Sequence, residues 1–294
     1  MPKIKKNIVD IKTSATLAIN ELSQKLKNRG QEIYKFGLGQ SPFPVPQIIV
    51  EELKKNAQQK NYINVSGLIE LRNLVAQYHT IKNKNNYTAD NVIIGPGSKE
   101  LIFHTQLVLD CDVLLPSPSW VSYEPQAQIL NKKIHWIKTD ATTNWHITPD
   151  DLDKISQDLH QVEKLLILNS PNNPSGTTHN NLEAFALIAK KNNIIVLSDE
   201  IYAELDFSGK YKSMSHYYPE GTIISSGLSK WCGAGGWRIG SLTFPKELKF
   251  IKNMVRNVAS ETFTAVSAPI QYASIKAYSE DHSQYLINSR KILE

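Results

Sequence analysis

Polar segments follow four short apolar runs of this sequence, at the points where buried strands would end. The run NVIIG leads into GSK (97–99), KLLILN into SPNNPSG (170–176), IIVLS into DEIY (199–202), and TIISS into GLSK (227–230). The carboxyl ends of neighbouring parallel strands meet at one edge of a sheet, where ligands bind. The sequence therefore predicts a binding site lined by these four segments.

The residue types in these segments suit a phosphorylated cofactor with a cationic ring. Gly97 and Ser98, at the start of a helix, offer free N–H groups and a hydroxyl to a phosphate. Asp199 would be costly to bury without a cationic or hydrogen-bonding partner, and a protonated ring nitrogen would be one. Lys230, crowded by glycines and near Arg238, would have its ammonium form disfavoured, as a Schiff-base lysine requires. Together these features indicate a pyridoxal phosphate pocket.

Other classes of site find less support in the sequence. The GSK segment lacks the GxxxxGKS/T spacing of a phosphate-binding loop, and the sixth position counted from Gly233 is Arg238 instead of the glycine of GxGxxG. The eight histidines form no HxxxH or HxH pair, which argues against a metal site.

Composition indicates a soluble globular protein. The chain has 294 residues, 41% hydrophobic and 21% charged, with a net charge of +5 spread along its length. The basic run MPKIKK is too short to argue for nucleic acid, and no apolar run reaches membrane-spanning length. Cys111 and Cys232 lie too far apart for a disulfide framework and suit a reducing compartment. We therefore expect a cytoplasmic protein.

Strands and helices that alternate along the chain must position the site. A helix is expected over 13–30, with Thr13 or Ser14 as its cap, and another after Thr148, with Pro149 in its first turn. Further helical patterns cover 46–60, 67–80, 98–109 and 181–192. The apolar runs predict strands at 91–95, 112–116, 133–137, 164–169, 194–198, 222–226 and 238–244. This alternation predicts an α/β fold, with a mostly parallel sheet covered by helices on both faces.

Three motifs carry a resemblance to a known family. NSPNNPSG (169–176), SDEIYAEL (198–205) and SKWCGAGGWRIG (229–240) resemble the NPxNPTG, SDEIY and SKxxxxxGWRIG stretches of class I/II aminotransferases. These enzymes, aspartate aminotransferase among them, belong to the fold-type-I pyridoxal-phosphate proteins. The similarity runs from the N-terminal helix through GLGQSPFPVP (37–46) and YINVSGLIELR (62–72) to the last residue.

The resemblance implies catalytic roles for three residues. Lys230 would form the internal aldimine with the cofactor and move a proton between Cα of the substrate and C4′ of the cofactor. Asp199 would pair with the pyridine nitrogen and keep it protonated. Tyr202, together with Asn173, would hydrogen-bond the phenolate oxygen of the cofactor.

The resemblance also implies how the rest of the site binds. Trp120 would stack on the cofactor ring, and Trp120, Asn173 and the backbone of Gly39 would contact the substrate. The phosphate would be held by Gly97, Ser98, Lys99 (chiefly through its backbone), Ser229 and Arg238. Some relatives carry a further phosphate-binding serine at the position of Gly227, for which Ser225, Ser226 or a backbone amide would substitute. Tyr62 would reach the phosphate of a neighbouring subunit, which implies a homodimer.

By the same resemblance, residues 1–45 form an N-terminal helix and arm, 46–275 the cofactor-binding large domain, and 276–294 the start of an interdomain helix. The rest of the small domain is expected to be missing, because members of the family extend further beyond the lysine motif than this sequence does. That part normally supplies the arginine that clamps the substrate carboxylate, and neither Arg256 nor Arg290 matches its motif. Three functions stay open. They are an aminotransferase acting on an amino acid and a 2-oxo acid, another fold-type-I enzyme such as a lyase or decarboxylase, and an inactive truncated relative.

Overall fold

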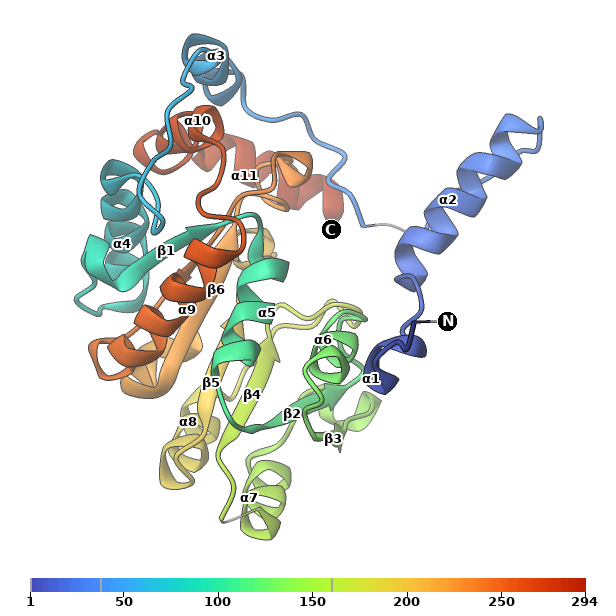
Figure 1. Ribbon diagram of the computed structural model, residues 1–294, viewed down its shortest axis with the longest axis vertical. Coiled ribbons are helices and arrows are strands. Elements are labelled where there is room, and N and C mark those ends of the chain that lie inside the picture. Colours follow the sequence, from blue (N-terminus) through green and yellow to red (C-terminus); the bar gives the residue numbers. More distant parts are fainter. Residues whose placement is uncertain (1, 38, 160) are drawn as a thin grey trace.

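A single mixed sheet forms the centre of the computed structural model, which describes residues 2–37, 39–159 and 161–294 (Figure 1). In this part of the chain the sheet has seven strands in the order β1-β7-β6-β5-β4-β2-β3. The strands are β1 (Val92–Gly95), β2 (Asp112–Ser117), β3 (Ile134–Lys138), β4 (Lys164–Asn169), β5 (Ile195–Asp199), β6 (Thr222–Gly227) and β7 (Gly240–Thr243). Each of them lies within one residue of a predicted run or inside it.

The sheet is mostly parallel, as predicted, and β7 is its exception. The pairs β2–β3, β2–β4, β4–β5 and β5–β6 are parallel, whereas β7 runs antiparallel to both β1 and β6. Gly240 pairs with Gly95 at the carboxyl end of β1 and with Gly227 at the carboxyl end of β6. The residues just before β7 therefore lie at the same edge of the sheet as the residues that follow the parallel strands.

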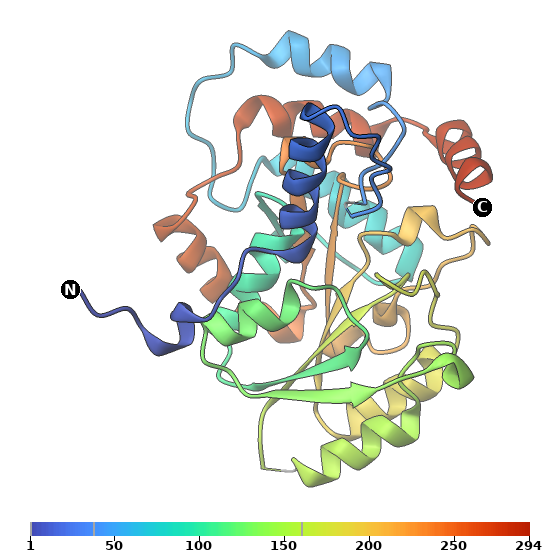
Figure 2. The ribbon, with the colours of Figure 1, turned by 90° about the vertical axis from the view of Figure 1, so that its right-hand side faces the viewer.

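Helices cover both faces of the sheet, which confirms the predicted three-layer arrangement (Figures 1 and 2). The core under one face includes α5 (Ser98–Val108), α6 (Tyr123–Ile129) and α9 (Lys249–Glu261). The core under the other face includes α7 (Pro149–Asp158) and α8 (Leu182–Lys191), with α4 (Ile69–Asn83) and α10 (Ala268–Ser279) against β1.

Strand β4 shows why the buried runs are continuous in the sequence. Leu165 and Ile167 point into the core with α5 and α6, while Leu166 and Leu168 point into the core with α7 and α8. Successive side chains of a strand point to opposite faces, so the four central positions of β4, which is covered on both sides, are all apolar.

Local signals set the start of α7 as the sequence predicts. Thr148 Oγ1 accepts a hydrogen bond from the Asp151 amide at 3.1 Å, and Asp151 Oδ2 accepts one from the Thr148 amide at 3.3 Å. Pro149 follows the cap, where its missing N–H costs nothing. This reciprocal capping satisfies N–H groups that have no partner within the helix.

The N-terminal segment contains α1 (Lys6–Val9) and α2 (Ala15–Asn28), and α2 stands beside the body of the molecule (Figure 1). Ser14 precedes α2 as its cap residue, although its side chain makes no capping hydrogen bond. Leu17, Leu22 and Leu26 form an apolar stripe along α2, and two of these side chains are largely exposed, Leu17 at 46% and Leu22 at 55%. The stripe therefore forms a helix face without becoming part of the core.

The remaining helices lie near the C-terminal end of the chain in space. Helix α3 (Gln47–Asn56) packs against α10, and α11 (Ser283–Leu293) follows a break at 280–282. The predicted helix from 276 is thus the end of α10 and a separate α11. None of the described helices is long and apolar enough to cross a membrane. The proposed domain boundaries remain a prediction.

Replacing Phe185 by alanine should destabilise the chain strongly, because Phe185 is fully buried on α8 in the core beneath β4. Loss of a buried phenylalanine typically costs about 3–5 kcal/mol of unfolding free energy. The control is Leu187→Ala on the same helix, where the side chain is 66% exposed. The control should change stability by less than about 0.5 kcal/mol. Urea denaturation followed by circular dichroism measures both, and equal effects would contradict the assigned orientation of α8.

Candidate active site

A cavity of about 570 Å³ lies at the carboxyl ends of the parallel strands. Asn169 ends β4 and Asp199 ends β5, and both side chains belong to its wall. The start of α5 and the segment after β6 complete that wall, so the four polar segments do converge. The predicted site residues in the wall are Gly39, Ser98, Lys99, Trp120, Asn173, Asp199, Tyr202, Ser229, Lys230 and Arg238.

Lys230 projects into this cavity from the segment after β6. Its Nζ donates a hydrogen bond to the Gly39 carbonyl oxygen at 2.7 Å and lies 5.5 Å from the centroid of the Tyr202 ring. Burial lowers the pKa of Lys230, the Asp199 carboxylate opposes this change, and the Arg238 charge adds to it. The ammonium form is thus disfavoured, as the glycine-rich surroundings and Arg238 predict.

Asp199 is fully buried at the end of β5. Tyr123 Oη on α6 donates a hydrogen bond of 2.6 Å to Asp199 Oδ2, whereas Oδ1 finds no hydrogen-bond partner among the described residues. Burial raises the pKa of this carboxyl to about 6, although the Tyr123 hydrogen bond, the nearby Ile201 amide and Ser225 hydroxyl, and the Lys230 charge favour the carboxylate. A buried carboxylate with one free oxygen is suited to a cationic or N–H partner that enters the cavity.

Tyr123 is a site residue that the sequence analysis missed. It lies three positions after Trp120 in SPSWVSYEPQ, and the two rings meet edge to face at 5.3 Å. The aromatic pair three residues apart was the available signal. Only the packing of α6 against the end of β5 shows that the hydroxyl reaches Asp199.

A second group of hydrogen bonds orders the wall around Tyr202. Asn173 Nδ2 donates to Tyr202 Oη at 3.3 Å, and the Asn173 amide donates to Asn169 Oδ1 at 2.7 Å. Asn169 Nδ2 in turn donates to the Asp199 carbonyl oxygen at 2.9 Å. Asn169 was also missed, because it was taken only as the last residue of a strand. Burial raises the pKa of Tyr202, and the Asp199 charge adds to the rise. The phenol is therefore available as a hydrogen-bond donor.

Arg238 and the start of α5 form a corner suited to an anion. Arg238 has the left-handed φ of 55°, and its Nη1 and Nη2 donate to the carbonyl oxygens of Gly235 and Pro96 at 2.9 and 3.2 Å. Gly97 is needed for this approach, because a Cβ there would lie 2.3 Å from Arg238 Nη2. The free N–H groups of a helix start and a neighbouring guanidinium are a usual phosphate-binding arrangement.

Lys99 and Trp120 lie side by side in the same wall. Lys99 Nζ is 5.0 Å from the centroid of the Trp120 ring, and this ammonium makes no hydrogen bond or ion pair with a described residue. Burial lowers the pKa of Lys99, and the Arg238 charge adds to the effect. The cavity thus has a cation that no carboxylate of the described chain neutralises.

Other residues named from the sequence lie outside the wall. Tyr62 is 95% exposed. Gly97 contacts the Arg238 guanidinium but is not itself part of the wall. Ser226 Oγ lies 3.0 Å from Ser241 Oγ, away from the cavity, and Ser225 is not part of the wall either. A Cβ at Gly227 would lie 2.8 Å from the Ile239 carbonyl oxygen, so a serine side chain has no room at this position.

Fold and site define the class of fold-type-I pyridoxal-phosphate proteins, and comparison with known proteins identifies the family. The family model described as Aminotransferase class I and II matches residues 31–294. Aspartate aminotransferase of Geobacillus stearothermophilus is 32% identical over 288 residues, which are 94% of this chain and 72% of that protein. The Bacillus subtilis aspartate aminotransferase is 30% identical over 287 residues, with the same coverage.

Comparison with a solved structure indicates the same family. Aspartate aminotransferase from Thermus thermophilus with maleate superposes with a TM-score of 0.91 at 26% identity, over 99% of this chain and 77% of that one. The chain therefore belongs to the class I and II aminotransferase family, and it is a transaminase of the pyridoxal-phosphate-dependent type. These findings favour transamination over the lyase and decarboxylase alternatives.

The cavity fits pyridoxal phosphate, the cofactor of this family. Asp199 belongs to the wall, and its buried Oδ1 makes no hydrogen bond with the described residues, which suits the N–H of a pyridinium ring. At the other end, Gly97 leaves the space in which Arg238 and the start of α5 can enclose a phosphate. Lys230 lies in the same wall with its ammonium form disfavoured.

Replacing Asp199 by asparagine should change how the stability of the cofactor-free chain depends on pH. Because the pKa rises from 3.8 to about 6 on folding, the folded chain holds more protons than the unfolded chain between these values. The wild type therefore loses stability as pH rises from about 4 to about 6, by about 3 kcal/mol, and the variant lacks this loss. In denaturant unfolding, the unfolding free energy of Asp199→Asn should therefore increase relative to that of the wild type between pH 4 and pH 7.

The matched control is Asp158→Asn, at an exposed carboxylate on α7. A difference between Asp199→Asn and the wild type that stays constant between pH 4 and pH 7 would contradict the raised pKa.

Proposed function

We propose that this chain moves an amino group between an amino acid and a 2-oxo acid, with Lys230 as the residue that binds the cofactor aldehyde. The observation that carries the proposal is the position of Lys230 and Asp199 in one cavity. The lysine has a disfavoured ammonium form there, and the carboxylate has an unpartnered oxygen.

Each part of the cavity would hold one part of the cofactor. Asp199 Oδ1 would accept the ring N–H, with Tyr123 holding the other oxygen in place. Tyr202 Oη, oriented by Asn173, would donate to the phenolate oxygen of the ring, and Trp120 would cover its face. Arg238, Ser229, Gly97 just before α5, and the first amides of α5 at Ser98 and Lys99 would bind the phosphate.

When bound, the cofactor supplies an electron-poor ring that accepts the negative charge developing at Cα of the amino acid. Lys230 Nζ is then the base that takes the Cα proton, which requires a neutral amine. The lowered pKa of Lys230 makes that form accessible. Asp199 keeps the ring nitrogen protonated. If the nitrogen lost its proton, the buried Asp199 carboxylate would be left without a cationic partner.

We further propose a homodimer and a cytoplasmic location. Tyr62 is almost fully exposed and lies outside the cavity of its own chain, which suits a contact with the phosphate of a second subunit. Cys111 and Cys232 are both free and buried, as in proteins of a reducing compartment.

Borohydride reduction after incubation with pyridoxal phosphate should attach the cofactor covalently to Lys230. Lys230→Ala should lose this adduct and the absorbance of the bound cofactor, because no other residue would form the imine. Lys246→Ala, at an exposed surface lysine, should retain both. Peptide mass spectrometry locates the adduct, and a specific adduct on another lysine in Lys230→Ala would contradict the assignment.

The amino donor is proposed to be aspartate or another acidic amino acid. The relatives described above are aspartate aminotransferases, and Lys99 provides a cation that no carboxylate in the described wall neutralises. Its ammonium would pair with the side-chain carboxylate of the donor, beside the ring of Trp120.

Lys99→Ala should therefore reduce kcat/KM for aspartate by about 10-fold or more, while kcat/KM for alanine changes by less than about 3-fold. Steady-state kinetics with both donors, and the dissociation constant of the cofactor, separate two roles of the lysine. Equal losses for both donors, accompanied by weaker cofactor binding, would instead assign Lys99 to the phosphate.

A further inference from the structure

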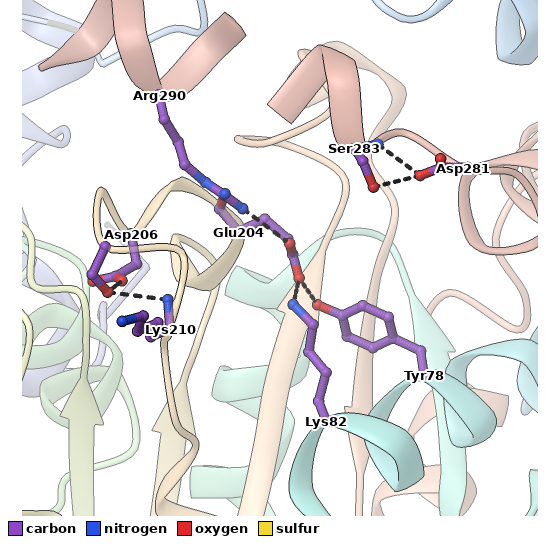
Figure 3. A network of polar contacts seen from close by, with 9 residues as sticks. Tyr78, Lys82, Glu204, Asp206, Lys210, Asp281, Ser283 and Arg290 are labelled. Atoms are coloured by element: carbon purple, nitrogen blue, oxygen red, sulfur yellow. Dashed lines mark hydrogen bonds and ion pairs between the residues drawn. The ribbon is translucent and has the colours of Figure 1, made fainter. Parts of the chain in front are cut away.

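Arg290, on α11, makes a polar contact next to the cavity that the proposed function does not use. Its Nε donates a hydrogen bond to the Glu204 carbonyl oxygen at 2.9 Å, and its Nη2 lies 3.8 Å from Glu204 Oε2. Figure 3 shows Arg290 reaching from the C-terminal helix to Glu204. One side chain thus holds both the backbone and the carboxylate of a residue two positions after Tyr202.

Glu204 joins three separate parts of the fold. Its carboxylate also accepts hydrogen bonds from Tyr78 and Lys82 of α4 (Figure 3). Glu204 is nearly buried, and Lys82, whose pKa is lowered to about 8 chiefly by burial, lies against it. A nearly buried carboxylate with several donors keeps its position only while those donors stay in place.

The turn that contains Glu204 is the direct continuation of Tyr202. This short 3-10 helix, η3 (Ala203–Leu205), directly follows Tyr202, and the Leu205 amide donates to the Tyr202 carbonyl oxygen at 2.8 Å. A three-residue 3-10 turn has little stability of its own, so outside contacts must define its position. The position of η3 sets the position of the Tyr202 backbone, and with it the reach of the phenol into the cavity.

Helix α11 also contacts the segment that follows Gly39, a residue of the cavity wall. Tyr285 Oη donates to the Pro44 carbonyl oxygen at 3.1 Å, in the segment that leads from Gly39. The neighbouring Phe43 carbonyl oxygen packs closely on Gly233, three residues after Lys230. A Cβ at position 233 would lie only 2.6 Å from this oxygen. The same helix is therefore attached both to the turn after Tyr202 and to the segment after Gly39.

We propose that Arg290 is a positioning residue for Tyr202: from α11 it fixes η3, and so places the tyrosine hydroxyl against the cofactor. This inference rests on the proposed function, because it assigns to Tyr202 the hydrogen bond to the phenolate oxygen. Arg290 itself is not part of the cavity wall. It transmits the position of the C-terminal helix to the cavity.

The test compares the holoenzymes of the wild type, Arg290→Ala, Arg290→Lys, Tyr202→Phe and the double variant Tyr202→Phe/Arg290→Ala. The quantity measured is the pH midpoint of the absorbance change of bound pyridoxal phosphate, which responds to the hydrogen bond from Tyr202. Lys291→Ala is the matched control, because Lys291 is the neighbouring exposed cation on α11. Hydrogen–deuterium exchange of residues 203–206 in the cofactor-free chain gives a second readout.

Arg290→Ala should move the midpoint in the same direction as Tyr202→Phe, by about half a pH unit or more, and should speed exchange at 203–206. In the double variant it should add little to Tyr202→Phe, because both changes remove the same contact. Arg290→Lys should restore part of the midpoint, since it retains the charge and one donor. Lys291→Ala should leave both readouts at their wild-type values.

Other results would overturn the inference. If Arg290→Ala lowers the melting temperature but leaves the midpoint within about 0.1 unit of the wild type, its role is only structural. A shift that adds in full to that of Tyr202→Phe also excludes an action through Tyr202. If Arg290→Ala does not fold, Arg290→Lys and Glu204→Gln decide by the same criteria. A wild type without a cofactor band, or a Tyr202→Phe variant without a shift, would refute the proposed function itself and this inference with it.

Discussion

The burial of the Asp199 carboxylate is the constraint on which the site depends. The end of β5 places this group where water does not reach it, and burial raises its pKa to about 6. Tyr123 satisfies one oxygen and leaves the other for whatever enters the cavity. The chain therefore holds an unfavourable group that a cationic ring would stabilise, and the binding free energy of that ring would offset the cost of folding around the carboxylate.

The antiparallel strand β7 places a cation, Arg238, at the start of α5. Because β7 runs against β1 and β6, the residue two positions before it lies at the carboxyl end of both strands. Arg238 can then lie along Gly97, with its backbone in the left-handed region. Glycine at 97 and 240 removes the two Cβ atoms that would separate the guanidinium from the amides of α5.

Much of this arrangement could be predicted because it rests on local patterns. Continuous apolar runs identified the strands, and their polar continuations identified the edge of the sheet at which Asp199 and Lys230 meet. The cap of α7 was read directly from Thr148 and Pro149. The same reasoning could not place the stripe on α2, because periodicity shows that a helix has an apolar face and does not show what covers it.

The amino-acid sequence by itself determined where the strands and the polar segments after them lie along the chain, the family, and the residue types of the cavity. Each of these depends on neighbours along the chain. Only the tertiary structure decided that Tyr123 reaches Asp199, 76 positions away, and that Arg290 reaches Glu204 across 86 positions. Contacts of this kind depend on how helices pack on the sheet, to within the few tenths of an ångström that a hydrogen bond allows. No local pattern in the sequence encodes that geometry.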